Sequence, residues 1–307
     1  MSEGGKIRAG NTTVEVSRAD KVLFPGAGVT KMDLAEYYLE IAPVALPYIK
    51  DRPVTMHRYP DGIDGESFYQ KEAPDYFPGW IDRVEVRIEG GKQEQVMAND
   101  AAALVYLADQ GCITPHVWLS RAGDLDRPDR MIFDLDPSKD DFAGVRKGAR
   151  ILRGILDDIG LVPFVMTSGS RGLHVVVPLD RGAGFDEVRS LASGIARLAA
   201  GRNPGLLTVE ARKNKRKGRI LIDYMRNAYA QTSVPPYCVR AREGAPVSAP
   251  IEWDELGRSG LTPKSYDIRG ILRRLGQKDD PWKGMMRRAR SIDGPRDKLE
   301  RMSEKES

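Results

Sequence analysis

The sequence contains little cysteine, little histidine and no long apolar segment. Its two cysteines, Cys112 and Cys238, are too few for a disulfide framework, and no Cys-x-x-Cys pair suggests a zinc site. No apolar run approaches the roughly 20 residues that a membrane-spanning helix needs. The N-terminal segment also lacks the apolar region of a signal peptide. We therefore expect a cytoplasmic protein without a membrane partner.

The composition is that of an ordinary soluble globular protein. Of the 307 residues, 41% are hydrophobic and 30% are charged, and the net charge of +4 is compatible with a polyanionic partner without indicating one. We find no internal repeat, low-complexity tract or linker, and we expect a single domain over residues 1–307. Residues 284–307 are rich in Lys and Arg and predict a basic, partly flexible tail.

Hydrophobic periodicity predicts an α+β fold, in which helices pack against a mixed sheet. Predicted strands cover residues 11–17, 52–58, 112–119, 130–136, 163–167, 173–177, 206–211 and 220–224, with a hairpin at 83–97. Predicted helices follow the capping residues Thr30, Asp100 and Asp141, and a further helix covers residues 185–200.

The chain is organised around the segment Arg130-Met-Ile-Phe-Asp-Leu-Asp-Pro-Ser138. Side chains at i and i+2 of a strand leave the same face, so Asp134 and Asp136 point together while Leu135 turns into the core. Two carboxylates on one face repel each other unless a cation lies between them, and oxygen ligands suit Mg²⁺ or Mn²⁺. The plain alternative is two solvated acids at a strand end. Asp124-Leu-Asp126 has the same spacing without an apolar run before it, and we interpret it as a loop.

Two later segments repeat this format, in which an apolar run ends in polar side chains. The strand at 163–167 leads into the turn Ser168-Gly-Ser-Arg-Gly172 and then His174, and Ile220-Leu-Ile leads into Asp223. If these strands are neighbours in one sheet, their polar ends converge on one edge. Three carboxylates there would hold two cations about 3.5–4 Å apart, which is the arrangement used for in-line phosphoryl displacement.

Groups that can bind phosphate accompany these acids. The Ser168–Gly172 turn offers backbone amides and a hydroxyl to a triphosphate, and His174 offers a ring N–H. Arg226 and Arg240 follow Asp223 and can neutralise further phosphates. The basic run, residues 212–219, is either a solvated loop or a contact to a nucleic-acid backbone. Its cations assigned to that contact are Arg212, Lys213, Lys215 and Arg216.

The N-terminal third carries cations and aromatic residues that allow two interpretations. Lys21 and Lys31 flank a Gly-rich loop at the start of a predicted helix, where they either bind a phosphate or are solvated. Phe68 and Tyr69 lie beside Lys71, and they either stack on a base next to a bound phosphate or pack in a core.

The order of three segments, Phe133-Asp-Leu-Asp-Pro137, Ser168-Gly-Ser-Arg-Gly-Leu-His174 and Leu221-Ile-Asp-Tyr224, resembles the three motifs of archaeo-eukaryotic primases. The nearest likeness is the polymerase domain of bacterial ligase D, used in non-homologous end joining, and it extends from Ala19 to about Lys283. It implies a primase–polymerase catalytic core of central β-sheets flanked by helices. Such domains are often fused to ligase and phosphoesterase domains, and this chain has room for neither. We therefore expect an excised domain or a stand-alone polymerase.

Position by position, the resemblance implies roles for the residues of these motifs. It implies metal binding by Asp134, Asp136 and Asp223, and it puts the family's active-site histidine at His116. The 5′-phosphate of a downstream DNA strand would be held by Lys21 and Lys31. Phe68 matches a Phe that stacks near the templating base or the DNA end. Tyr69 stands where relatives carry a second Phe, and His57 stands where a lysine can occur. The residues assigned to nucleotide binding are Ser168, Gly169, His174, Arg226, Arg240 and Lys71.

The leading hypothesis is a template-directed nucleotidyltransferase that uses two Mn²⁺ or Mg²⁺ ions to fill gaps and extend 3′ ends at 5′-phosphorylated breaks. By resemblance, it would prefer ribonucleotides and act with Ku and a separate ATP-dependent DNA ligase. A de novo primase, which needs no primer, is one alternative. A two-metal nuclease and a non-catalytic module that binds DNA ends are the others.

Overall fold

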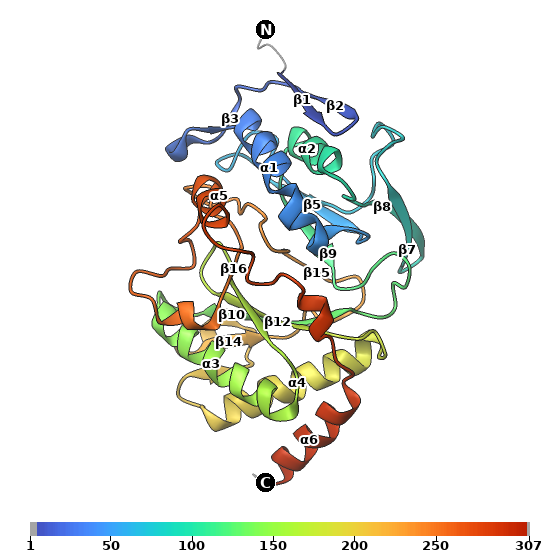
Figure 1. Cartoon of the computed structure of the whole chain (residues 1–307). Helices are drawn as coiled ribbons and strands as arrows, with labels where there is room; N and C mark the ends of the chain where they lie inside the picture. Colours follow the sequence, from blue (N-terminus) through green and yellow to red (C-terminus); the bar gives the residue numbers. More distant parts are fainter. Residues whose placement is uncertain (1–4, 306–307) are drawn as a thin grey trace. The chain divides into compact units, whose positions relative to one another are not determined.

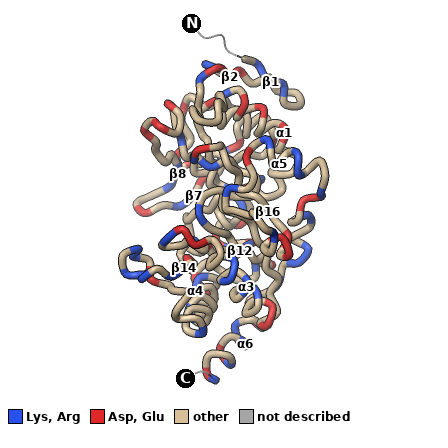
Figure 2. The backbone as a smooth tube through the Cα atoms, turned by 90° about the vertical axis from the view of Figure 1, so that its left-hand side faces the viewer, with Lys and Arg blue, Asp and Glu red and all other residues tan. Residues whose placement is uncertain are grey.

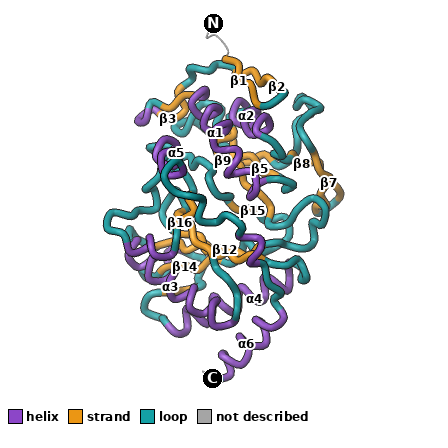
Figure 3. The backbone as a smooth tube through the Cα atoms, in the orientation of Figure 1, coloured by secondary structure: helices purple, strands orange, loops and turns teal. Residues whose placement is uncertain are grey.

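The structure is a computed structural model in which residues 5–305 are described (Figure 1). The chain folds into two compact units that are interleaved along the sequence. Unit 1 comprises Met1–Gly123, Thr232–Ala249 and Tyr266–Asp279, and unit 2 comprises Asp124–Gln231, Pro250–Ser265 and Asp280–Ser307. Because the chain passes between the units several times, composition revealed no boundary. The α+β (mixed α/β) class predicted from the sequence is confirmed (Figure 3).

Unit 1 is built around a four-stranded sheet with the strand order β15-β9-β5-β6. Two helices, α1 and α2, pack on each other beside it, and the remaining strands form three hairpins, β1–β2, β3–β4 and β7–β8. The elements are β1 (Gly5–Ala9), β2 (Thr12–Val16), β3 (Val22–Phe24), β4 (Val29–Thr30), α1 (Lys31–Ile49), β5 (Val54–Arg58), β6 (Phe68–Gln70), β7 (Arg83–Ile88), β8 (Gly91–Val96), α2 (Ala101–Asp109), β9 (Cys112–Trp118), β15 (Thr232–Ser233) and α5 (Ile268–Leu275).

Helix α1 begins where the sequence predicts, because its N-terminus has a complete capping box. The Thr30 hydroxyl accepts a hydrogen bond from the Asp33 amide at 3.1 Å, and the Asp33 carboxylate accepts one from the Thr30 amide at 2.7 Å. This cap makes Lys31 the first helical residue. The Lys31 amide donates to the Lys21 carbonyl at 2.8 Å, so the cap also brings the backbones of the two predicted phosphate-binding lysines together.

Unit 2 contains a six-stranded sheet with the order β13-β14-β10-β12-β11-β16, against which α3 and α4 pack (Figure 1). The elements are β10 (Arg130–Pro137), α3 (Phe142–Ile159), β11 (Phe164–Thr167), β12 (Leu173–Pro178), α4 (Phe185–Arg202), β13 (Leu207–Thr208), β14 (Ile220–Asp223), β16 (Ala249–Ile251) and α6 (Asp293–Glu304). The strand predicted at 206–211 is shorter than expected. Residues 209–211 lie outside β13, and the carbonyls of Glu210 and Ala211 instead accept hydrogen bonds from the Arg216 guanidinium.

The sheet of unit 2 has one face covered by helix α3 and the acids on the other. Leu135 is fully buried between Asp134 and Asp136, as the alternation predicts. A Cβ added at Gly148 of α3 would lie 3.3 Å from Leu135 Cδ2, so α3 packs closely on the Leu135 face. The two carboxylates therefore lie on the face opposite to α3.

The segment predicted as a basic tail contains helix α6 in the structure. Pro295 and Leu299 are its buried residues, and a Cβ added at Gly194 of α4 would lie 2.8 Å from Leu299 Cδ2. Helix α6 therefore packs on α4. None of the helices within residues 5–305 combines the length and the apolar character needed to cross a lipid bilayer.

Candidate functional site

The acids of unit 2 form a row across neighbouring strands. Asp134 on β10 is the register partner of Asp223 on β14, and on its other side it is the register partner of His174 on β12. Residues that face each other across antiparallel strands project from the same face of the sheet. The His174 Nε2 atom lies 3.6 Å from Asp134 Oδ1, which agrees with this geometry. We call His174, Asp134 and Asp223 the acid row. Asp136 lies two residues further along β10 on the same face.

Asp136 forms ion pairs with two arginines, whereas Asp134 lies opposite another acid. Arg171 Nη2 donates to its Oδ1 at 2.7 Å and Arg216 Nη1 donates to its Oδ2 at 2.8 Å. Arg216 is buried, and its other guanidinium hydrogen bonds go to the carbonyls of Glu210 and Ala211. The arginine pair compensates the carboxylate charge on an edge that would otherwise be strongly negative.

The donor types and the register of these acids fit a divalent cation site, because carboxylate oxygens on one face are the ligands that Mg²⁺ and Mn²⁺ prefer. Their side chains are not arranged as a finished site. No group of three His, Cys, Asp or Glu side chains within residues 5–305 is placed to hold an ion. Both oxygens of Asp136 are bound by Arg171 and Arg216, so a cation bound by Asp136 would compete with these arginines.

The Ser168–Gly172 turn lies at the same edge and has a defined internal structure. The Ser168 hydroxyl accepts hydrogen bonds from the amides of Ser170 (3.2 Å) and Gly172 (3.0 Å), and Gly169 has a φ of 63°, in the left-handed region. Gly172 has no room for a side chain, because an added Cβ would lie 1.8 Å from the Leu135 carbonyl oxygen. The turn is therefore pressed against β10 immediately behind Asp136.

The basic run divides into exposed and buried residues. Arg212, Lys213 and Lys215 are exposed, as a contact to a nucleic-acid backbone requires. Arg216, which we also assigned to that contact, is instead buried against Asp136. Figure 2 shows Lys and Arg interspersed with Asp and Glu along the backbone, so this exposed run is a local feature rather than part of a uniformly basic chain.

In unit 1, the predicted active-site histidine belongs to an aromatic cluster. The rings of His57 and Tyr69 are stacked with centroids 4.0 Å apart, and His116 contacts both edge-on, at 6.0 Å from His57 and 5.5 Å from Tyr69. Tyr59 lies 4.5 Å from His57. Tyr69 is 59% exposed, so the cluster leaves an aromatic surface open to a ligand.

The other residues assigned to base and phosphate contacts lie on strand β6 and the chain after it. Phe68 is 45% exposed, and the Arg58 guanidinium lies 5.5 Å from its ring centroid. Lys71 is exposed directly after β6. Their exposure argues against the alternative in which these aromatic residues pack in a core.

The two lysines assigned to a 5′-phosphate have different surroundings. Lys21 is partly exposed and forms a short ion pair with the exposed Asp61, whose carboxyl pKa is lowered by the hydrogen bond and the charge of Lys21. Lys31 is 4% exposed, and its ammonium group donates to Asp109 at 2.9 Å and to the Ser17 hydroxyl at 3.0 Å. Of the two, Lys21 is thus the lysine that can exchange its partner for a phosphate at little cost.

Comparison with known proteins places this chain in a family. The model of the LigD primase–polymerase domain matches residues 30–282. The chain belongs to the LigD primase–polymerase domain family. This family is one of DNA-directed, metal-dependent nucleotidyltransferases.

Individual members of the LigD family align over most of this chain. The multifunctional non-homologous end joining protein LigD of Pseudomonas aeruginosa is 34% identical over 284 residues, covering 92% of this chain and 34% of that protein. The bifunctional LigD of Bacillus subtilis is 31% identical, covering 88% of this chain and 43% of that protein. The chain thus spans about a third to two-fifths of the length of these relatives.

A solved structure supports the same assignment at the level of the LigD polymerase domain. The polymerase domain of Mycobacterium tuberculosis ligase D in complex with DNA superimposes with a TM-score of 0.85 at 32% sequence identity. The match covers 90% of this chain and 99% of that domain, so the similarity extends over both units.

One residue that positions the acids of this LigD-type domain was not identified from the sequence. Asn227 is fully buried, and its side-chain oxygen accepts from the Ile132 amide at 2.8 Å while its amide nitrogen donates to the Ile132 carbonyl at 2.7 Å. It pairs with β10 just as a strand residue would, and so fixes the chain directly after Asp223. The signal in the sequence is weak, since Asn is common in loops.

The aromatic cluster of this LigD-type domain predicts a pH dependence of stability. Desolvation, followed by the charges of Arg240 and Arg242, lowers the pKa of His57 from 6.5 to about 4. Between pH 6.5 and about 4 the unfolded chain therefore binds a proton that the folded chain does not. Stability contributed by neutral His57 is complete above pH 6.5 and is lost as the pH falls to about 4.

We expect wild-type protein to lose about 1 kcal/mol more unfolding free energy than His57→Gln on going from pH 7 to pH 4.5, a value reduced for the partial exposure of the ring. Urea unfolding at both pH values measures this difference. Parallel losses in the two proteins would show that His57 titrates normally in the folded state.

Proposed function

We propose that this chain transfers nucleotidyl groups from NTP or dNTP to the 3′-hydroxyl of a DNA strand, copying a template at gaps and breaks that carry a 5′-phosphate. The observation that carries this proposal is the acid row, in which Asp223 is the register partner of Asp134 on the face shared with Asp136. The names of the relatives, which refer to non-homologous end joining, support the biological setting.

In this proposal, Asp134, Asp136 and Asp223 hold two Mn²⁺ or Mg²⁺ ions. Such ions lower the pKa of the attacking 3′-hydroxyl and neutralise the triphosphate, so no protein nucleophile is needed. The carboxylates of Asp134 and Asp223 supply oxygen ligands from neighbouring strands. Arg171 and Arg216 keep Asp136 charge-compensated until its oxygens are used as ligands.

The remaining residues bind and orient the substrates. His174 and the Ser168–Gly172 turn, with Gly169 in its left-handed conformation, contact the triphosphate from the same edge as the acid row. Further contacts to the nucleotide come from Arg226, Arg240 and Lys71. The aromatic cluster supplies His116 to the reaction and Tyr69, with Phe68, for stacking at the template. The exposed members of the basic run contact the DNA backbone.

The proposal extends to the setting of the reaction. The enzyme prefers ribonucleotides, works with Ku and an ATP-dependent DNA ligase, and acts on DNA in the cytoplasm, at the nucleoid. The DNA in complex with the M. tuberculosis domain supports a DNA substrate.

Primer dependence tests the function directly. We expect extension of a primer on a 5′-phosphorylated gapped duplex with Mn²⁺ and NTPs, and no product from a single-stranded template that lacks a primer. Product without a primer would instead identify a de novo primase. Isothermal titration of the protein with a nonhydrolysable NTP, in the presence and absence of Mn²⁺, is a second test. We expect nucleotide binding that depends on the metal, whereas a passive end-binding module shows none.

Lys21→Ala is expected to remove the preference for a 5′-phosphate over a 5′-hydroxyl. A charge-assisted hydrogen bond to phosphate contributes about 1.5–3 kcal/mol, so affinity for the phosphorylated gap should fall about tenfold or more while affinity for the hydroxyl form changes little. Lys31 is less suitable, because its removal leaves the Asp109 carboxylate, 9% exposed, without its cation. Fluorescence anisotropy with both duplexes makes the measurement.

Lys50→Ala is the matched control, since Lys50 is exposed at the end of α1 and its replacement removes the same charge from unit 1. An equal loss on both duplexes in Lys21→Ala would assign Lys21 to general DNA binding.

A further inference from the structure

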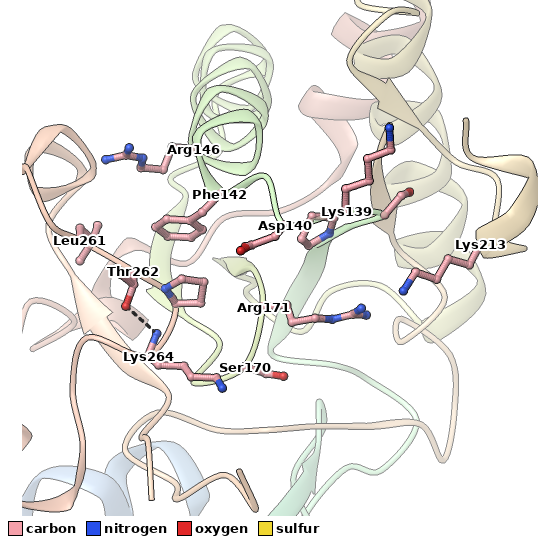
Figure 4. Close-up of a pocket in the computed structure, with 13 residues that line it drawn as sticks. Lys139, Asp140, Phe142, Arg146, Ser170, Arg171, Lys213, Leu261, Thr262 and Lys264 are labelled. Carbon is pink, nitrogen blue, oxygen red and sulfur yellow. Dashed lines mark hydrogen bonds between the residues drawn. The ribbon is translucent and has the colours of Figure 1, made fainter. Parts of the chain in front are cut away.

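Unit 2 contains a pocket of about 620 Å³ beside the acid row and outside it (Figure 4). Five segments line this pocket: the end of β10 with the loop of residues 138–140, the first two turns of α3, the Ser168–Gly172 turn, the basic run at Lys213, and residues 261–264. The volume is within the range of ligand-binding sites, about 300–1,000 Å³. Arg171 connects the pocket to the acids, because it lines the pocket and also donates to Asp136.

The charges that line the pocket are mostly positive and uncompensated. Lys139, Lys213 and Lys264 line it, and within residues 5–305 none of the three has a carboxylate in ion-pair range. Figure 4 shows the side chains of Arg171 and Lys213 extending toward one another. Two cations that face each other across a cavity repel, and an anion between them removes the repulsion. Asp140 contributes a carboxylate to the lining, which leaves the sum strongly positive.

One wall of the same pocket is apolar. Phe142 and Leu261 lie there, across the cavity from Lys213 (Figure 4), and Pro263 also lines the pocket. Phe142 also has the Arg146 guanidinium 5.6 Å from its ring centroid, which orients the ring. Cations together with an aromatic wall match a single nucleic-acid strand, which presents a phosphate and an unpaired base together. A duplex offers no base face to an aromatic side chain, because its bases are stacked on one another and only their edges are exposed in the grooves.

We propose that this pocket binds a phosphate of a single nucleic-acid strand between Arg171, Lys213 and Lys264, with the adjoining base or sugar against Phe142. The basic run continues away from the pocket through the exposed Lys215, so the strand is bound over more than one nucleotide. A strand seated here passes directly beside Asp136. The inference rests on the proposed function, which requires single-stranded nucleic acid at the acid row.

Salt dependence of binding tests this pocket without any catalytic step. The test variant is Lys139→Ala/Lys264→Ala, which leaves the basic run intact. Its matched control is Lys147→Ala/Lys298→Ala, which removes two lysines from helices α3 and α6 outside the pocket lining and gives the same net charge. A fluorescent single-stranded oligonucleotide is titrated by anisotropy over a series of salt concentrations.

We expect the pocket variant to bind about tenfold more weakly at low salt, and the slope of log K against log salt to fall by about 0.7 for each phosphate that the variant no longer neutralises. The control should keep the wild-type slope. Phe142→Leu should weaken binding about fivefold without changing the slope, because it removes stacking and no charge.

Equal slopes in the pocket variant and the control would overturn the proposal. So would weaker binding of ATP alone, with unchanged oligonucleotide binding, since that result assigns the pocket to a free nucleotide. Primer extension by the wild-type protein distinguishes failure of the proposed pocket from failure of the proposed function. If the wild type extends a primer and the slopes are equal, only the strand pocket fails; if it does not extend a primer, the proposed function fails.

Discussion

Asp223→Asn is expected to abolish nucleotidyl transfer while the protein stays folded. Asparagine retains the side-chain oxygen that accepts from the Met225 amide at 2.8 Å, so the end of β14 keeps its local hydrogen bond. What disappears is one negative oxygen ligand opposite Asp134. Metal ions at such a site contribute several kcal/mol of transition-state stabilisation, so we expect a loss of roughly a thousandfold or more in rate.

Single-turnover extension on the 5′-phosphorylated gapped duplex measures this loss, and thermal unfolding checks the fold. Asp126→Asn is the matched control, because it makes the same chemical change in the other Asp-Leu-Asp segment, which was predicted as a loop and lies outside the named strands and helices. We expect wild-type rates for the control. A folded Asp223→Asn protein that extends the primer at the wild-type rate would refute the catalytic role of the acid row.

Gly172→Ala is expected to have the second-largest effect on activity, because of a steric clash rather than a change of charge. An added Cβ would lie 1.8 Å from the Leu135 carbonyl oxygen and 3.0 Å from its carbon, and both are backbone atoms that cannot rotate away. The Ser168–Gly172 turn must then move off β10 next to Asp136. We expect a loss of several kcal/mol in unfolding free energy, as for other strongly overpacked sites, together with loss of extension activity.

Gly154→Ala provides the contrast within the same unit. Gly154 lies inside helix α3, and an added Cβ there meets no atom of the described chain within 4 Å. Because alanine is the better helix former, the free energy of unfolding of this variant should be about 0.5–1 kcal/mol higher than that of the wild type. Urea unfolding of both variants makes the comparison. A wild-type urea midpoint for Gly172→Ala would show that the Ser168–Gly172 turn does not pack closely on the backbone of β10.

Local sequence patterns were sufficient to predict many of the helices and strands and the chemical type of the candidate site. The alternation around Leu135 predicted which face carries Asp134 and Asp136, and the burial of Leu135 confirms it. The capping box at Thr30 predicted the start of α1. Such features are readable because they depend on residues within one or two turns or on the period-2 geometry of a strand.

The partners of the charged residues could not be read in the same way. Nothing near Asp136 in the chain indicates Arg216, which is 80 positions away, and nothing near Lys31 indicates Asp109, which is 78 positions away. We assigned Arg216 to the contact with the nucleic-acid backbone because it belongs to the basic run, residues 212–219. Its burial depends on how the chain between β13 and β14 folds back over β10, which composition does not encode.

The sequence by itself determined the chemical groups, the strand ends that carry them and the family motifs in their order. Only the tertiary structure decided that Asp223 is the register partner of Asp134, that two arginines hold Asp136, and that three lysines line a pocket beside them. The physical reason is the range of the interactions. Helix caps and strand alternation act between near neighbours, whereas register and ion pairing join segments whose separation along the chain carries no information about their distance in space.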